Sequence, residues 1–111
     1  MINITHHGAT SGVTGSCHEL TLDFGSAPTP ESSSAGILID CGLFQGQEKG
    51  DGASASDLSV DFPIEHIRAL VVTHVHIDHV GRIPYLLAAG FEGPIICSEP
   101  SAIMLPEILE D

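Results

Sequence analysis

The chain has 111 residues, enough for one small domain with a modest hydrophobic core. Hydrophobic residues make up 42% and charged residues 16%, a balance that argues against wholesale disorder. Fifteen acidic residues against Lys49, Arg68 and Arg82 give a net charge of −12. Such a surface repels phosphate backbones, so a groove for a polyanion would have to be built mainly from residues outside this chain.

Neither a membrane span nor a secreted scaffold is indicated. No apolar run approaches the length of a membrane helix, and the N-terminus lacks the basic start and apolar core of a signal peptide. Cys17, Cys41 and Cys97 are too few and too scattered for a disulfide framework. We therefore expect reduced, mostly buried thiols in a cytoplasmic protein.

The chain begins with patterns typical of strands. Residues 2–5 predict a short strand that leads into a turn rich in Gly, Ser and Thr. Residues 19–24 alternate between apolar and polar side chains, which predicts a half-buried strand. Its apolar face would carry Leu20, Leu22 and Phe24.

The middle of the chain alternates between polar and apolar stretches. Residues 25–36 predict a flexible hairpin connection, and residues 37–40 a fully buried strand that ends at an aspartate. The polar stretch 47–59 has little reason to pack. Residues 61–67 can cap and start a helical turn, with a proline near its first position.

The last third predicts a regular succession of strand, helix, strand and helix. We expect a buried strand at 69–74 and a helix at 81–90, closed by Gly90, whose Pro84 must lie in the first turn. The core side of that helix would carry Ile83, Leu86 and Leu87. A strand at 93–98 and a final helix at 98–111 follow, with Ser98 as a cap and Pro106 as a kink. This order describes a layered α/β unit.

Three histidines and an aspartate occupy six positions at the end of the strand 69–74. On an extended backbone His74 and His76 point to the same side, Asp78 continues that spacing, and His79 follows as the chain turns toward a helix at Gly81. Imidazole and carboxylate groups suit zinc and related divalent metals. A single histidine beside a strand is usually structural, but four such side chains at this spacing favour a metal site.

These four side chains cannot all bind one ion from one short segment. We expect two ions side by side, with His74 and His76 serving one ion and Asp78 and His79 serving the other.

The segment "THVHIDHVG" (73–81) resembles the THxHxDHxG signature of the metallo-β-lactamase superfamily. The resemblance implies an α/β protein: the first half of an αββα sandwich, with a mixed sheet and helices on one side. It also implies that His74 and His76 bind a first metal, that Asp78 and His79 bind a second, and that Asp78 helps to orient a nucleophilic hydroxide. Asp40, in "LIDCG", would brace the metal-binding loop through hydrogen bonds without binding metal.

The flanking sequence resembles the start of β-CASP nucleases, which include metal-dependent ribonucleases and the eukaryotic cleavage and polyadenylation endonuclease. The resemblance implies hydrolysis of RNA phosphodiester bonds by two zinc ions in the full-length protein. The matching stretches, in order, are "GATSGVTGSCHEL" (8–20), "ILIDCGLFQG" (37–46), "THVHIDHVGRIPYLLAAGFEGPI" (73–95) and "EPSAIMLPEILED" (99–111).

In that family the loop equivalent to residues 8–16 lies beside the active site. The resemblance thus implies a loop close to the substrate, with small side chains at Gly8, Thr14, Gly15 and Ser16; a tight Gly-rich turn with no contact to substrate is an equal alternative. Arg82 could meet a phosphate, although a role at the surface or at a helix terminus is favoured. The remaining histidines match no metal motif and predict solvated or core side chains: His6, His7, His18 and His66.

The family's site is completed by later histidine and aspartate residues, and its RNA cleft by an inserted β-CASP domain. None of these lies within residues 1–111, so we expect the chain to be the N-terminal portion of a metallo-β-lactamase domain. The isolated chain would be inactive, would bind zinc weakly or not at all, and could self-associate through exposed sheet surface.

Two alternatives stay open. One is another hydrolase of the same superfamily, such as a thioesterase with a small acidic substrate. The other is a non-catalytic subunit or scaffold that kept the fold; the four intact ligand residues count against it. The sequence that follows residue 111 separates the three readings, because the β-CASP insertion would bring further His and Asp motifs.

Overall fold

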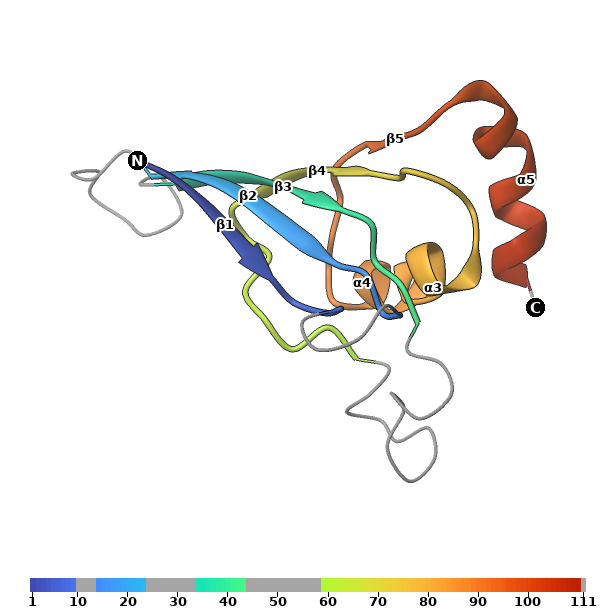
Figure 1. The fold of residues 1–111 in the computed structure, drawn as a ribbon, viewed down its shortest axis with the longest axis horizontal. Helices are drawn as coiled ribbons and strands as arrows, with labels where there is room; N and C mark the ends of the chain where they lie inside the picture. Colours follow the sequence, from blue (N-terminus) through green and yellow to red (C-terminus); the bar gives the residue numbers. More distant parts are fainter. Residues whose placement is uncertain (10–13, 24–33, 44–58, 111) are drawn as a thin grey trace.

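The structure is a computed structural model that describes residues 1–9, 14–23, 34–43 and 59–110. Within these residues, strands form a single five-stranded sheet in the order β1-β2-β3-β4-β5, and helices follow the fourth and fifth strands (Figure 1). The elements are β1 (Ile2–His6), β2 (His18–Asp23), β3 (Ser34–Ile39), β4 (Ile67–Val71), α3 (Ile77–Val80), α4 (Ile83–Ala88), β5 (Ile95–Ile96) and α5 (Glu99–Glu110).

The sheet is mixed, as the resemblance implied. β1, β2 and β3 pair antiparallel, whereas β3, β4 and β5 run parallel. The carboxyl ends of β3 and β4 therefore meet at the same edge of the sheet. Asp40 follows one of these strands, and the segment with the candidate ligands follows the other.

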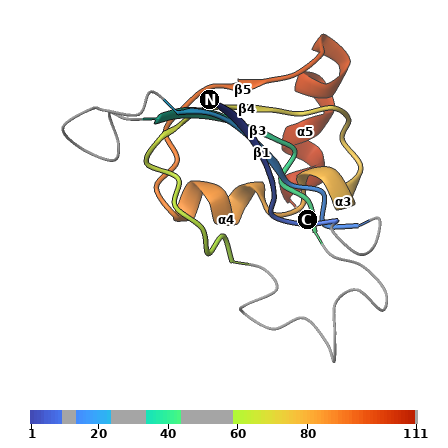
Figure 2. The same cartoon turned by 60° about the vertical axis from the view of Figure 1, so that its left-hand side comes forward.

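The hydrophobic core lies on one face of the sheet. Leu38 of β3 pairs with Leu70 of β4, and both side chains are fully buried. Val80 of α3 and Ile83 and Leu86 of α4 are also fully buried in this cluster. Figure 2 shows α3 and α4 on this side of the sheet. Each such side chain contributes about 1.5–3 kcal/mol by leaving water, so this layer holds the two helices against the strands.

Among the described residues, none covers the opposite face of the sheet, and this corrects the expected burial of β2. Leu20 and Leu22 are 37% and 42% exposed, whereas Glu19 is only 7% exposed. The cause is the register of the sheet. Glu19 lies opposite the core residue Leu38, so its side chain points to the core face, and that of the next residue, Leu20, points to the opposite face. Phe24 lies outside the described residues. The uncovered face holds an apolar groove of about 320 Å³, lined in part by Ile2, Leu20, Leu22, Ala35, Ile37 and Arg68.

Two expectations for the helices are met only in part. Residues 61–67 form no helix; a single turn, in which the Ile67 N–H donates to the Ile64 carbonyl, leads directly into β4. The expected helix at 81–90 is shorter, since α4 begins at Ile83 after a separate short helix, α3. Leu87 is half exposed because it lies about 100° around the helix from the buried Leu86.

Several sequence signals do mark element ends correctly. Pro84 lies in the first turn of α4, and Gly90 follows its last residues with a φ of 107°. The Ser98 hydroxyl accepts a hydrogen bond from the Ser101 N–H and so caps α5, and Pro106 lies inside that helix. Among the described residues, no helix has the length and apolar character needed to cross a membrane.

A buried carboxylate joins the segment before β4 to the N-terminal strands. The two Glu19 oxygens lie 2.8 Å from His7 Nε2 and 2.6 Å from His66 Nε2, and the Thr21 hydroxyl donates to one of them. The His7 ring stacks on Phe62 with 3.6 Å between ring centroids. Burial by itself would raise the pKa of Glu19, but the hydrogen bonds from Thr21, His66 and His7 outweigh it and lower the pKa below its ordinary value of 4.5.

This carboxylate gives a test of the fold. Because the Glu19 pKa is lower in the folded chain, its contribution is present above pH 4.5 and is lost as the pH falls through the folded-state pKa. Glu19→Gln should lower the free energy of unfolding at pH 7 by about 1–3 kcal/mol and flatten the loss of stability below pH 4.5. Urea unfolding at several pH values measures both effects. Glu65→Gln is the matched control, because Glu65 is exposed and lies beside His66 in the segment before β4. Equal stability and pH dependence of the two variants would contradict the stabilising role of Glu19.

Candidate metal centre

The candidate ligands lie beyond the end of β4, at the edge of the sheet. β4 ends at Val71, so His74 and His76 are on an extended segment outside the strand, and Asp78 and His79 are in α3. The expectation that Asp78 continues the alternating spacing of the strand is therefore wrong, because Asp78 lies in a helix. The His74 and His76 rings lie 4.9 Å apart between centroids, and the His74 and His79 rings 3.9 Å apart. The fold thus brings the three imidazoles together.

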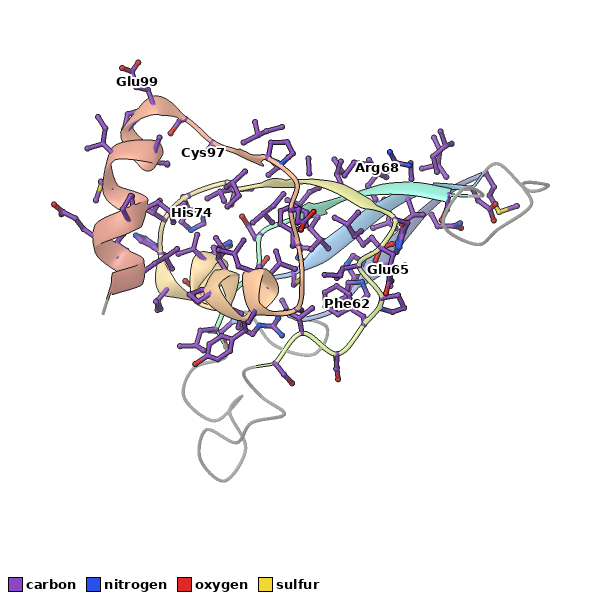
Figure 3. All side chains as sticks on the ribbon, turned by 180° about the vertical axis from the view of Figure 1, so that it is seen from behind. Phe62, Glu65, Arg68, His74, Cys97 and Glu99 are labelled. Atoms are coloured by element: carbon purple, nitrogen blue, oxygen red, sulfur yellow. The ribbon has the colours of Figure 1, made fainter. Side chains whose placement is uncertain are left out.

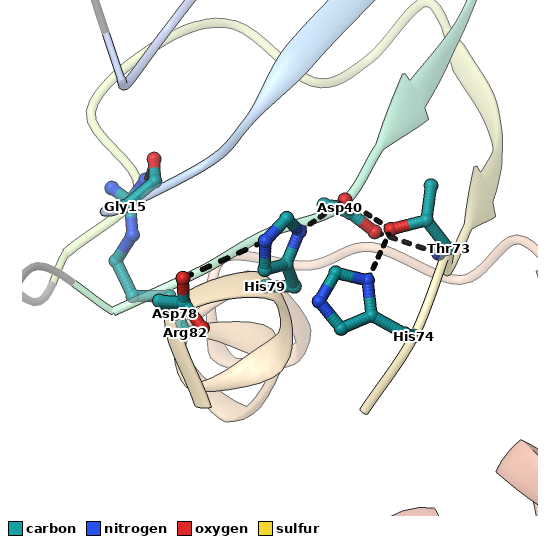
Figure 4. Close-up of polar contacts among 7 residues, drawn as sticks. All are labelled: Gly15, Asp40, Thr73, His74, Asp78, His79 and Arg82. Atoms are coloured by element: carbon teal, nitrogen blue, oxygen red, sulfur yellow. Dashed lines mark hydrogen bonds and ion pairs between the residues drawn. The ribbon is translucent and has the colours of Figure 1, made fainter. Parts of the chain in front are cut away.

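Asp40 is the buried centre of this region, at 2% exposure. It accepts hydrogen bonds from the Thr73 N–H at 2.8 Å, from the Thr73 hydroxyl at 2.7 Å and from His79 Nδ1 at 2.7 Å (Figure 4). Its φ is 64°, a left-handed conformation that aspartate and asparagine tolerate better than most residues. These bonds fix the loop after β4 to the end of β3.

The same carboxylate determines which nitrogen of two imidazoles carries the proton. A carboxylate only accepts, so His79 must donate from Nδ1; in the neutral ring its Nε2 then has a free lone pair. The Thr73 hydroxyl donates its single proton to Asp40. Its oxygen, 3.1 Å from Nδ1 of His74, can therefore only accept a hydrogen bond from that nitrogen. Both imidazoles are therefore held in the tautomer whose Nε2 is able to bind a metal. No motif in the sequence indicated this role for Thr73.

Backbone hydrogen bonds hold α3 from three sides. The Asp78 carbonyl accepts a hydrogen bond from the Ser16 N–H at 3.1 Å. The His79 carbonyl accepts one from the Cys41 N–H at 2.9 Å, and the Ile77 carbonyl accepts one from the Leu43 N–H at 3.0 Å. Segments before β2 and after β3 therefore fix the backbone of the two candidate ligands in α3.

Glycines permit these close approaches. A Cβ on Gly42 would collide with the Asp78 carbonyl, and one on Gly81 would lie 2.6 Å from Leu43 Cβ. Gly81 has an ordinary helical φ of −65°, so packing, and not a special turn as the sequence suggested, requires a glycine there.

The described ends of the loop 8–16 lie against each other and against this region. A Cβ on Gly8 would collide with the Gly15 carbonyl, and Gly15 has a φ of 73°. Gly15 and Ser16 are buried, and Thr14 is partly buried. The described ends of the loop thus lie close together, residues 10–13 lie outside the described part of the chain, and contact of Gly8, Thr14, Gly15 and Ser16 with a substrate stays a prediction.

The histidines outside the cluster lie in two hydrogen-bonded groups. His7 and His66 bind Glu19, and His6 and His18 face each other across β1 and β2 with 2.7 Å between their Nδ1 atoms. Burial, followed by the neighbouring His6, lowers the pKa of His18. Arg82 is at a helix terminus, as expected, because it is the N-cap residue of α4. At 3% exposure, however, its side chain is neither at the surface nor open to a phosphate, so those parts of the expectation are wrong.

All three cysteines are free thiols, and Cys17 and Cys41 are fully buried. Their side chains hydrogen-bond to each other; this bond and burial raise the pKa of Cys17, whereas accepting the bond lowers the pKa of Cys41.

The donor set fits a divalent metal in its chemistry. Nε2 of His79 lies 3.6 Å from Asp78 Oδ2, so two potential ligand atoms are adjacent, and Asp40 gives His79 the orienting partner that metal-bound histidines usually have. Among the described residues, however, no three His, Cys, Asp or Glu side chains are arranged to hold a metal ion. Coordination by His74, His76, Asp78 and His79 therefore stays a prediction.

Comparison with known proteins identifies the family. The model of the metallo-β-lactamase superfamily matches residues 31–111. The chain is 32% identical over 110 residues to Ribonuclease TTHA0252 of Thermus thermophilus, and 39% identical over 87 residues to transcription termination factor FttA of Methanosarcina mazei. It is 37% identical over 79 residues to cleavage and polyadenylation specificity factor subunit 3-II of Arabidopsis thaliana.

The chain belongs to the metallo-β-lactamase superfamily, as its motifs indicated. The three alignments cover 99%, 78% and 68% of the chain but only 22%, 13% and 13% of these relatives. The chain thus spans about a fifth or less of their length. Their names agree with the RNA-processing branch that the flanking motifs indicated.

Asp40 gives a test of the orientation of these imidazoles. Asp40→Asn keeps the left-handed backbone accessible but turns an NH2 group toward donors, so we expect a loss of about 1–3 kcal/mol in the free energy of unfolding. Thr73→Val, which leaves the His79 bond intact, should cost only about 1 kcal/mol. Nitrogen-15 NMR of the histidine rings should show His79 protonated at Nδ1 in the parent chain and a mixture of tautomers in Asp40→Asn. An unchanged tautomer in that variant would contradict the assignment.

Proposed function

We propose that the chain is the N-terminal portion (residues 1–111) of a longer metallo-β-lactamase domain, in a β-CASP-type ribonuclease that hydrolyses RNA phosphodiester bonds with two zinc ions. One observation carries the proposal: the buried Asp40 carboxylate, directly and through Thr73, bonds to Nδ1 of His79 and orients His74, and Nε2 of His79 lies 3.6 Å from Asp78 Oδ2. Relatives that include a ribonuclease support RNA as the substrate.

Each side chain has a proposed task. His74 and His76 would hold one zinc ion, and Asp78 and His79 the other. When bound, the ions would supply Lewis-acid polarisation of the phosphodiester and a hydroxide nucleophile at neutral pH. Asp78 would accept a hydrogen bond that orients this nucleophile, while Asp40 and Thr73 keep the imidazoles in the tautomer that can bind metal.

RNA would be bound mainly by other parts of the longer protein. The chain has a net charge of −12. Arg82 is buried, and Arg68 lies on the uncovered face of the sheet, on the side away from Phe62 and Glu65 (Figure 3). The described residues therefore offer little positive charge beside the candidate ligands. With too few ligands for a closed zinc site, the isolated chain would bind zinc weakly and would be inactive. Free thiols support a reducing, cytoplasmic location.

The proposal is tested by His76→Ala in the full-length protein. We expect loss of at least about 100-fold in RNA hydrolysis together with a lower zinc content, measured by turnover of labelled RNA and by elemental analysis. His6→Ala, an exposed histidine of β1 outside the candidate set, should keep both. Full turnover by His76→Ala would exclude the proposed site. Hydrolysis of thioesters but not RNA by the parent would favour the other hydrolase, and lack of any hydrolysis with zinc bound would favour a scaffold.

We further propose that the isolated chain self-associates through the uncovered face of the sheet. Ile2 and Ile4 are 68% and 66% exposed there, next to Leu20 and Leu22; in the longer protein the second half of the sandwich would cover them. Light scattering after size-exclusion chromatography should show a mass that rises with concentration, and Leu22→Lys should shift it toward the monomer. Ile103→Lys, an equally polar change on exposed α5, should not. A monomer at every concentration would refute self-association.

A further inference from the structure

We infer that Arg82 is a positioning residue that fixes the substrate-side loop (the ends of residues 8–16) to the candidate metal ligands. Its guanidinium joins carbonyls of two separate segments that both contact the backbone of Asp78. The inference rests on the proposed function for its effect on RNA hydrolysis, whereas its structural part can be tested separately.

Arg82 lies at the junction of α3 and α4, three residues after His79. Its backbone N–H donates to the Cys41 carbonyl at 2.9 Å, and its own carbonyl accepts from Tyr85 and Leu86 in α4, each at 3.0 Å. Both ends of the residue are therefore held by regular backbone bonds. The side chain, at 3% exposure, extends inward from this fixed base.

The guanidinium contacts two carbonyls from different segments. Nε donates to the Gly42 carbonyl, just after β3, and Nη2 lies 3.5 Å from the Gly15 carbonyl, just before β2. In Figure 4 the side chain extends from beside Asp78 up to Gly15. Buried carbonyls need donors, and here one planar side chain supplies donors to both.

The same two segments meet at Asp78. The Ser16 N–H donates to the Asp78 carbonyl at 3.1 Å, and the Gly42 N–H donates to the Ser16 carbonyl at 2.8 Å. Arg82, Gly15–Ser16, Gly42 and Asp78 therefore form a closed ring of contacts that includes the backbone of one candidate ligand. Removing the guanidinium opens this ring on the side of the loop.

Gly8 joins the other end of the loop to the same point. A Cβ there would collide with the Gly15 carbonyl and would lie 3.5 Å from Arg82 Nη2. Gly8→Ala should therefore push Gly15 away from the guanidinium while leaving Arg82 in place. It offers an independent way to break the same contact.

Arginine suits this position better than lysine. Its donors lie in a rigid planar fork that can serve two acceptors, whereas lysine offers a single flexible ammonium. Arg82→Lys keeps the charge and removes the fork.

Hydrogen exchange read by mass spectrometry on the full-length protein tests the structural part. In Arg82→Lys and in Gly8→Ala, peptides that contain the amides of Ser16 and Gly42 should exchange at least about tenfold faster. The peptide that covers the centre of β4 should be unchanged. Arg68→Lys, the same change at an exposed arginine, should alter neither. Uniform acceleration of all peptides, or no acceleration at Ser16 and Gly42, would overturn the inference; Arg82→Met serves as a second variant if Arg82→Lys does not fold.

Kinetics test the consequence for function. A displaced loop should weaken RNA binding in the ground and transition states alike, so Arg82→Lys should raise KM about tenfold with kcat within about threefold and zinc content unchanged. Loss of zinc in parallel with activity would mean that Arg82 acts through the ligands, and would overturn a role on the substrate side. If the parent does not hydrolyse RNA, the proposed function fails, while the exchange data still decide whether Arg82 holds the loop.

Discussion

The region around the candidate ligands depends on one buried carboxylate. Asp40 has almost no contact with solvent, so its charge must be satisfied by the protein, and the donors are Thr73 and His79. These bonds tie the end of β3 to the segment after β4. Because the two strands are parallel neighbours, a short side chain at the end of one strand can reach the loop that follows the other. A change at Asp40 would affect the fold of this edge and the state of the imidazoles together.

Around this carboxylate the chain is packed by backbone rather than by large side chains. Gly8, Gly42 and Gly81 each lie where a methyl group would meet another segment, and the amides of Ser16, Cys41 and Leu43 donate to α3. Such packing fixes Asp78 and His79 to within a narrow range of positions, as a metal site requires. Arg82 adds a donor where two of these segments approach each other.

The two faces of the sheet have different roles. The face with Leu38 and Leu70 is covered by helices and forms the core, whereas the part of the chain that the structure describes leaves the face with Leu20 and Leu22 open. An open apolar face of this kind suits the half of a sandwich. Together with the acidic charge and the small share of each relative that the chain spans, it is consistent with the proposal that other parts of a longer protein would bind the RNA.

The sequence by itself determined the family and singled out the candidate ligands, because ligand-type residues at short spacing and glycine-rich flanks are local patterns. It also marked the ends of α4 and α5 through Pro84, Gly90 and Ser98, since caps and turns depend on neighbouring residues. It misjudged which face of β2 is buried, because an apolar alternation does not say which face the helices cover. The tasks of Thr73, Glu19 and Arg82 were decided only by the tertiary structure. Each of these side chains bonds to groups far away in the chain, and only the pairing of the strands and the packing of the helices bring those groups within reach.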